Sequence, residues 1–517
     1  MTKKELLKIL GSCDWKEEEA QASIHIIDHY KTCYLESRYA YGQDFHSIVL
    51  YYLTDKNNYA FEWARKDEAR RTLNWFLENY KLKPKFLRNK IKEFQRVSRK
   101  IQKLFDSIKK EGLVDRSNQV LLQLLEETHH LGNEQYGYAI IPEGLDTLSE
   151  EDYLSYLPKV HAKDNLNVLR ALSGFENLSF LEKEKLELLR LAQKVVKNSD
   201  LKKAVASRSI IQIRRFPDFF KKLQNITDSY FWTQNSFVRA TYLDQKYFLG
   251  LITDIIKDKT ANQINKEIKD LSNKVSRRER EISAINKKYK LNKKAKIFFE
   301  FVRDCAWLQD QRKENVQRLV FCMDQILNQA AKRFKINRKE LDSYFVLEVI
   351  NLFNQGKKLL KKVVEKRRKR VLFVSYLQND KIVTDIFLGQ EAEKITNAFK
   401  QKVRQAVPLG EIKGFVASPG RGSRIITGKA HIVFDASRNK FKKGEILITG
   451  MTRPEFVPLM KKAKAVITNE GGITTHSAIV SRELKIPCII GTKVATERIK
   501  TGDKISLDLN SGIIKII

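Results

Sequence analysis

The chain has 517 residues, a formal net charge of +35, and five cysteines that lack the paired spacing of a zinc site or a disulfide framework. It holds no apolar run of about 18 residues and no apolar signal core near Met1. We therefore expect a soluble, cytoplasmic protein and no membrane partner. The positive charge favours anions such as nucleotides, phosphorylated metabolites or nucleic acid, although a solvated, lysine-rich surface has the same composition.

Glycine and tryptophan divide the chain into two unequal parts. Of its 22 glycines, 12 lie after residue 400, whereas all 5 tryptophans lie before it. Glycine-poor sequence suits long helices, and glycine-rich sequence suits strands joined by tight turns. The composition therefore predicts a multi-domain protein in which a large, mostly α-helical N-terminal region precedes a compact α/β domain.

The N-terminal region is expected to be helical nearly throughout, in two parts. Residues 1–160 are predicted to form one helical subdomain. Within it, residues 87–105 repeat apolar side chains at intervals of three and four, which is typical of a long amphipathic helix. Residues 161–403 are predicted to form a second helical domain with a small hairpin near residues 371–388.

A linker is expected at residues 404–413. It contains Pro408 and Gly410, and both residue types interrupt regular structure. It separates the helical region from a compact domain predicted at residues 414–517.

The strongest functional pattern surrounds His476. Two glycines that free the backbone to turn and two threonines suited to N-cap positions precede it: Gly471, Gly472, Thr474 and Thr475. His476 is therefore expected in the first turn of a short helix. There the helix dipole and unpaired N–H groups disfavour imidazolium and bind anions. The pattern predicts a neutral, nucleophilic histidine that accepts a phosphoryl group.

Other histidines carry weaker patterns. His25 and His29 have the i, i+4 spacing of a metal-binding pair, with Asp28 between them, but no third ligand pattern accompanies them. We interpret them, and the neighbours His129 and His130, as ordinary helix-face residues. No metal ligand is predicted.

The run from Gly471 to Arg482 resembles the phosphohistidine signature of the PEP-utilising enzymes, the family of pyruvate phosphate dikinase, phosphoenolpyruvate synthase and rifampin phosphotransferase. Similar stretches flank it, at Gly414–Gly420, Phe441–Leu447, Met451–Pro458 and Gly502–Asp508. Residues 414–517 thus resemble the mobile, swivelling phosphohistidine domain, and the resemblance implies that the linker at residues 404–413 is a hinge. Residues 290–400 more weakly resemble the helical domain that precedes it.

The resemblance implies roles for individual residues. His476 would carry the phosphoryl group, and hydroxyls of the preceding threonines would hold its oxygens. Arg482 is a candidate cation for the phosphoryl charge, with a structural ion pair as its alternative. The supporting residues implied in this way are Gly471, Gly472, Thr474, Thr475 and Arg482.

A complete member of that family also needs an ATP-grasp domain with a glycine-rich loop and carboxylates for Mg²⁺. The first 400 residues hold only 10 glycines and no clustered loop, and no PEP- or pyruvate-binding barrel follows before the chain ends at Ile517. We therefore expect this chain to bind no cofactor itself. ATP and Mg²⁺ are expected to act through a separately encoded ATP-grasp nucleotide-binding protein.

Three functional hypotheses follow. In the first, the chain is a phosphotransferase component that carries a phosphoryl group on His476 to pyruvate or another small molecule. In the second, it is a non-catalytic regulatory or interaction protein that keeps the swivelling fold. In the third, it is a helical nucleic-acid-binding protein, which the scattered basic residues and the lack of an aromatic-rich motif do not favour. The intact signature favours the first.

Overall fold

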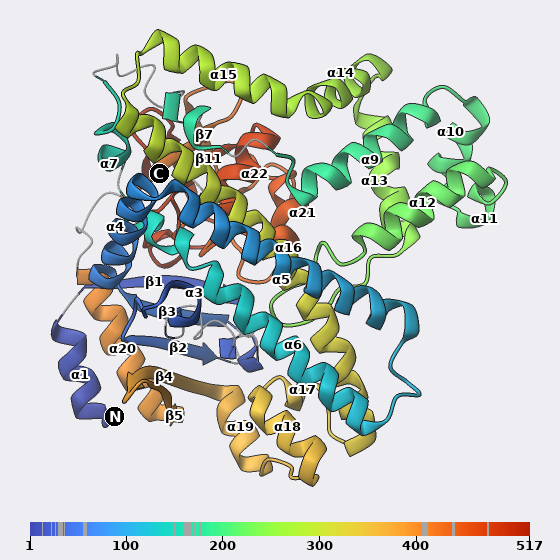
Figure 1. Cartoon of the computed structure of the whole chain (residues 1–517). Coiled ribbons are helices and arrows are strands. Elements are labelled where there is room, and N and C mark those ends of the chain that lie inside the picture. Colours follow the sequence, from blue (N-terminus) through green and yellow to red (C-terminus); the bar gives the residue numbers. More distant parts are fainter. Residues whose placement is uncertain are drawn as a thin grey trace.

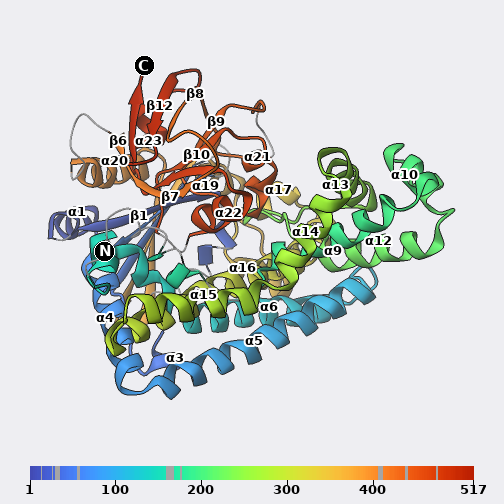
Figure 2. The same ribbon diagram turned by 90° about the horizontal axis from the view of Figure 1, so that it is seen from above.

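The fold is described from a computed structural model. The structure describes residues 1–12, 14–21, 23–25, 27–28, 35, 37–54, 59–148, 150–158, 168–169, 171–174, 177–405, 412–436, 440–472 and 475–517. Most of the N-terminal region is helical, as the composition predicts, and the C-terminal domain is built around a sheet (Figures 1 and 2). No described helix combines the length and apolar composition that crossing a bilayer requires.

The helical body is organised around α16 (Lys293–Phe334), a helix of 42 residues that packs against α5 (Pro84–Glu111) and α6 (Asn118–Tyr138). The predicted amphipathic helix at residues 87–105 lies within α5 and buries Phe94, Val97 and Ile101. Among the described residues, the other helices of the body are α1 (Lys3–Ser12), α3 (Arg38–Tyr41), α4 (Lys66–Leu82), η1 (Ile141–Thr147), α7 (Glu150–Leu154), α17 (Arg338–Leu341), α18 (Val346–Gln355), α19 (Lys361–Lys369) and α20 (Gly389–Gln405).

An arm of helices projects from this body (Figure 1) and has its own hydrophobic core, which includes Leu189, Leu223 and Phe248. Its helices are α9 (Phe180–Val195), α10 (Ser199–Ala206), α11 (Ile210–Ile213), α12 (Pro217–Tyr230), α13 (Gln245–Asp258) and α14 (Ala261–Ser272), and α15 (Lys274–Lys288) leads back to α16.

The hydrophobic core of the helical body includes residues from both sides of the predicted subdomain boundary at residue 160, such as Tyr153 and Leu169. The boundary at residue 160 stays a prediction.

The expectation of helix nearly throughout residues 1–400 is wrong for three segments. They form β1 (Trp15–Gln21), β2 (Ile48–Thr54) and β3 (Tyr59–Arg65), which join β4 (Arg370–Gln378) and β5 (Lys381–Leu388) in an antiparallel sheet of order β1-β3-β2-β4-β5.

The composition and burial of β2 explain the error. The strand is rich in β-branched and aromatic residues, and its alternate side chains enter two different cores, Val49 one and Leu50 the other. Both faces are therefore buried, so no alternation of polar and apolar residues marks it in the sequence. β4 and β5 pair along the segment where the sequence predicts a hairpin.

The C-terminal domain contains an eight-stranded sheet of order β6-β13-β12-β8-β9-β10-β11-β7. Its elements are β6 (Ile412–Lys413), β7 (Phe415–Pro419), β8 (Ile425–Ile432), β9 (Ile446–Thr449), η2 (Pro454–Phe456), α21 (Val457–Met460), β10 (Ala465–Thr468), α22 (His476–Leu484), β11 (Pro487–Ile490), α23 (Ala495–Arg498), β12 (Lys504–Asp508) and β13 (Ile513–Ile516). β8, β9, β10 and β11 run parallel, and antiparallel pairs flank them. Of the predicted hinge, residues 406–411 lie outside the described residues.

The sheet curves almost into a barrel. Its two edge strands, β6 and β7, are separated in the chain by Gly414 alone, so the edges must lie close together. A Cβ atom on Gly512 would lie 2.0 Å from the Gly414 carbonyl oxygen. Only glycine fits this close approach between backbones.

Candidate functional site

The helix α22 begins at His476, as the sequence predicts. Thr475 is its N-cap residue, with the extended angles φ −68° and ψ 160° that such residues adopt. The helix follows β10, a central strand of the sheet. The first backbone N–H groups of α22 have no partner within the helix, so the helix start is suited to bind anionic oxygens beside His476.

A glycine turn fixes the position of that helix start. Gly471 has φ +150°, and a Cβ atom there would lie 2.7 Å from Cβ of Ile490 on β11. The Gly472 carbonyl accepts hydrogen bonds from the Thr475 backbone N–H at 3.1 Å and from its hydroxyl at 2.9 Å. Gly471 therefore permits close packing of the turn on β11. Gly472 and Thr475 are brought together, whereas Thr474 lies outside the described residues.

Asn469 ties the same turn to the following loop, and it was not among the predicted site residues. Its backbone N–H donates to the Thr449 carbonyl at 3.1 Å. Its buried side chain accepts from the Thr496 backbone N–H at 3.1 Å and donates to the Thr496 hydroxyl at 2.5 Å. The loop before His476 is therefore held in place by both the backbone and the side chain of Asn469. Its asparagine side chain, which both donates and accepts, is the signal that was available.

Arg482 lies in the last turn of α22. It is six residues beyond His476, which corresponds to about 9 Å along the helix axis. Burial raises the pKa of the Cys488 thiol on β11 to about 12, and the positive charge of Arg482 opposes this rise. Arg482 thus lies near β11, and its part in holding a phosphoryl group stays a prediction.

Thr452 and Arg453 extend the site beyond the predicted residues. The Thr452 hydroxyl donates to the Ser477 hydroxyl at 2.9 Å, and both side chains are buried. Arg453 stacks its guanidinium on Phe237 of the helical body, with 3.8 Å between the guanidinium carbon and the ring centroid. The edge of the C-terminal domain that carries His476 therefore faces the helical body (Figure 2).

Three carboxyl groups at or near this junction have raised pKa values: Glu184 is buried, and Asp310 and Glu455 are half-buried. No local sequence pattern marks them. Burial raises the pKa of Glu455 to about 7, against the opposing charges of Arg453 and Lys313. Burial also raises the pKa of Asp310 to about 7, with Glu314 adding to the shift. The third group, Glu184, likewise reaches about 7 through burial.

Four arginines of the helical body have protein partners that satisfy their guanidinium groups at least in part. Arg318 donates to Glu314 at 2.6 Å, and Arg367 donates to Glu348 at 2.6 Å. The same holds for Arg303, which donates to the Leu172 carbonyl at 3.0 Å, and for Arg312, which pairs with Glu143. Within the described part of the chain, no cluster of three or more His, Cys, Asp or Glu side chains could hold a metal ion.

Comparison with known proteins agrees with the geometry of the C-terminal domain. Residues 441–512 match the family model "PEP-utilising enzyme, mobile domain". The chain is 46% identical over 123 residues to phosphoenolpyruvate synthase of Pyrococcus furiosus, and 40% identical over 141 residues to phosphoenolpyruvate synthase of Aquifex aeolicus. The resemblance of the C-terminal domain to the PEP-utilising enzymes is thereby confirmed, and we call it the mobile domain below.

These likenesses concern a limited part of each protein. The aligned segments make up 24% and 26% of this chain, and this chain covers only 14% and 16% of the two relatives. A probable phosphoenolpyruvate synthase of Pyrococcus horikoshii is 51% identical over 104 residues, which are 20% of this chain and 12% of that protein. Each match is thus about the size of one domain.

Proposed function

We propose that this chain is a phosphotransferase component in which His476 accepts a phosphoryl group and passes it to a second molecule. One observation carries the proposal: the signature histidine is the first residue of α22 in a domain that matches the PEP-utilising mobile domain. A helix start supplies N–H groups for phosphoryl oxygens, and His476 is the residue at which this helix begins. The relatives named phosphoenolpyruvate synthase support the same reaction class.

The reaction divides into two transfers through a covalent intermediate. In the first, a neutral imidazole nitrogen of His476 attacks the phosphorus of the donor. An N–P bond forms and the P–O bond to the leaving phosphate breaks. In the second, an acceptor oxygen attacks the same phosphorus, the N–P bond breaks and the imidazole nitrogen regains its lone pair. The acceptor loses a proton, from its methyl carbon when pyruvate enolises or from the hydroxyl of another acceptor, and this proton must go to a base.

The donor and the acceptor are also part of the proposal. We assign the donor to ATP with Mg²⁺, held by a separately encoded ATP-grasp protein, because no glycine-rich phosphate-binding loop is evident before residue 400. The acceptor is pyruvate or another small molecule with a nucleophilic oxygen.

The junction between the mobile domain and α16 supplies groups suited to the acceptor side. Lys313 interacts electrostatically with both Asp310 and Glu455, so these three side chains share one region of the junction. A carboxyl group with a pKa near 7 is a suitable base for the acceptor proton at neutral pH. A lysine beside it is suited to an anionic acceptor such as a carboxylate.

Labelling of the full chain tests the proposal. Incubation with ATP, Mg²⁺ and a candidate ATP-grasp partner is expected to give an acid-labile, alkali-stable phosphoprotein. The His476→Ala variant should take up no label. The matched control is His431→Gln, because His431 is the other histidine of the mobile domain and is bound to Glu445 at 2.8 Å. Equal labelling of His476→Ala would overturn the assignment, and a chain that no partner labels would favour a non-catalytic interaction protein.

A further inference from the structure

The contact between Arg453 and Phe237 joins two parts of the chain that are distant in sequence. Only 4% of Arg453 and 9% of Phe237 is exposed. A cation stacked on an aromatic ring is stabilised most when water is excluded from both groups. The contact is therefore a desolvated one between the mobile domain and the helical body.

The same contact is connected to the start of α22. Arg453 follows Thr452, whose hydroxyl binds Ser477 at 2.9 Å, and Ser477 follows His476 in α22. A movement of the backbone segment that carries Thr452 and Arg453 away from Phe237 would therefore also move the start of α22 away from the helical body. The stacking reports whether the histidine-bearing edge is docked.

Phe237 belongs to a loop, residues 231–244 between α12 and α13, that is fixed from several sides. Asn235 donates to the Gln317 carbonyl of α16 at 2.8 Å. The Phe237 carbonyl accepts from the backbone N–H and from the hydroxyl of Ser23, both at 3.2 Å. The loop is thus held to a central helix and to the N-terminal segment independently of the mobile domain.

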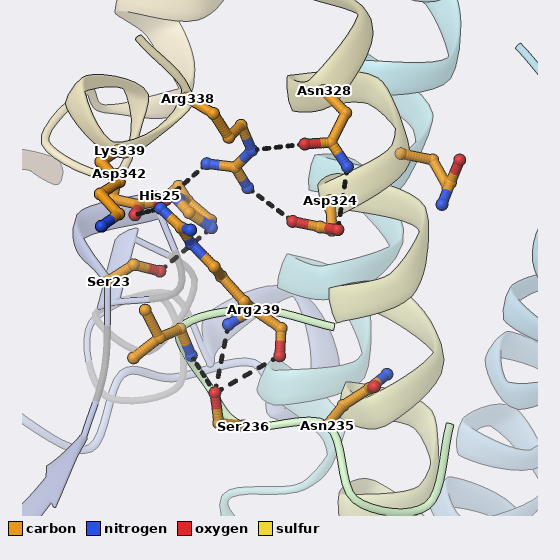
Figure 3. A network of polar contacts seen from close by, with 12 residues as sticks. Ser23, His25, Asn235, Ser236, Arg239, Asp324, Asn328, Arg338, Lys339 and Asp342 are labelled. Atoms are coloured by element: carbon orange, nitrogen blue, oxygen red, sulfur yellow. Dashed lines mark hydrogen bonds and ion pairs between the residues drawn. The ribbon is translucent and has the colours of Figure 1, made fainter. Parts of the chain in front are cut away.

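A charged network holds the far side of the loop (Figure 3). Arg239 donates to Asp342 at 2.6 Å, and Arg338 donates to Asp342 at 2.5 Å and to Asp324 of α16 at 2.7 Å. The side chains of Arg338, Asp324 and Asp342 are largely buried, at 16%, 8% and 12% exposure. Buried, fully paired charges define a single arrangement because any other would leave a charge unpaired. The loop is therefore preorganised.

Charges on the two sides of the junction are complementary at two further places. Burial raises the pKa of Glu455 in the mobile domain and of Glu184 in α9, and a lysine of the opposite side opposes each rise: Lys313 of α16 acts on Glu455, and Lys461 of the mobile domain acts on Glu184. Each side thus contributes one cation and one carboxyl group. Such an arrangement favours one orientation of the two surfaces over others.

We propose that the loop at residues 231–244 is a preorganised docking surface for the mobile domain, and that it recognises the Arg453 guanidinium through the Phe237 ring. This inference rests on the proposed function in one respect: the docked position is the one in which His476 delivers its phosphoryl group on the acceptor side. The contact between Arg453 and Phe237 is then broken and remade in each transfer cycle. Arg453 and Phe237 are positioning residues for the second transfer.

A double-mutant cycle in the full chain tests docking without any chemistry. The variants are Phe237→Leu, which keeps apolar volume, Arg453→Gln, and the two combined. Hydrogen exchange is measured on residues 451–460 and 231–244. We expect each single substitution to weaken docking about tenfold and to speed exchange in both segments, with the combined variant little worse than either single one.

The matched control uses a similar stacking that lies in the arm. Arg214 stands over Phe220 with 5.7 Å between the guanidinium carbon and the ring centroid. Phe220→Leu should leave exchange at the mobile domain unchanged. Two outcomes would overturn the docking surface. One is that Phe237→Leu and Arg453→Gln have additive effects on hydrogen exchange. The other is that a substitution in one of the two segments, 231–244 or 451–460, leaves exchange in the other segment unchanged.

Transfer measurements separate this inference from the proposed function. Discharge of phosphorylated protein to the acceptor should slow about tenfold in Phe237→Leu and Arg453→Gln and stay unchanged in Phe220→Leu. Suppose that the two substitutions affect hydrogen exchange non-additively in a chain that is never phosphorylated. That result would support the docking surface and overturn the proposed phosphoryl transfer. Normal discharge from both variants in a labelled chain would overturn the role of the contact in transfer.

Discussion

The hydroxyl of Thr452 donates a hydrogen bond to the hydroxyl of Ser477 across 2.9 Å, and it does so where both side chains are buried. The bond joins the segment after β9 to the first turn of α22. The segment after β9 carries Arg453, and the first turn of α22 carries His476. This one bond therefore links the contact with the helical body to the residue proposed to react.

Replacement of Thr452 by valine should affect both stability and transfer. The change keeps the shape of the side chain but leaves the buried Ser477 hydroxyl without this donor, which typically costs about 1–2 kcal/mol of unfolding free energy. The rate of His476 labelling should fall as well, because the start of α22 loses a fixed neighbour. Urea unfolding and a labelling time course measure the two effects.

The control for that variant is Thr501→Val, which removes the acceptor of the Ile432 backbone N–H at 3.0 Å. It should lower stability by a similar or smaller amount and leave labelling unchanged. If Thr501→Val slows labelling as much as Thr452→Val does, the effect is one of general stability and the link to α22 is wrong.

Substitution of Gly471 by alanine should destabilise the mobile domain by about 2–4 kcal/mol, because a positive φ and a close neighbour act together. The new methyl group would lie 2.7 Å from Cβ of Ile490. Gly444 offers a control, since it has φ +91° with open space around it. Gly444→Ala should cost only about 1 kcal/mol, the backbone part of the effect. Equal losses of unfolding free energy in Gly471→Ala and Gly444→Ala, measured with denaturant, would show that packing on β11 does not require glycine at residue 471.

The pattern around His476 made the start of α22 predictable, because its glycines and threonines are local signals of a turn and a helix cap. The contact of Arg453 with Phe237 was not predictable, because it joins residues more than two hundred positions apart. Strand β1 was missed for a similar reason. Its charged run Glu17–Glu19 lacks strand-forming residues and gains its conformation from pairing with β3. Non-local pairing decides such segments, and no local pattern encodes it.

Stability should depend on pH through Asp310. Burial raises its pKa from an ordinary value near 4 to about 7, so the folded state binds this proton more tightly than the unfolded state. Ionisation between about pH 4 and 7 therefore destabilises the folded state, and the loss is complete above about pH 7. Asp310→Asn should remove this loss and gain about 1–3 kcal/mol relative to the natural chain at pH 8, with little gain at pH 4.

Unfolding of both proteins by denaturant at pH values from 4 to 8 measures the difference, in which all other titrating groups cancel. Asp115→Asn, at an exposed turn position, is the control and should give a flat difference. A difference for Asp310→Asn that does not grow with pH would show that this carboxyl is not held in an unfavourable environment.

The mobile domain should fold independently and be released by cleavage within residues 404–413. Two hydrophobic cores of the domain are formed entirely by residues from Ile412 onward, so the buried apolar surface that stabilises the fold does not depend on the helical body. Pro408 and Gly410 disfavour regular structure between the two parts, and proteases cut such segments first. Limited proteolysis with mass spectrometry should give a fragment beginning between residues 404 and 413, and a separately expressed 412–517 chain should unfold cooperatively. If the helical body is cleaved at the same rate, or if the 412–517 chain unfolds without a cooperative transition, the two parts form one folding unit. A domain fixed in this way could not carry a phosphohistidine between two sites.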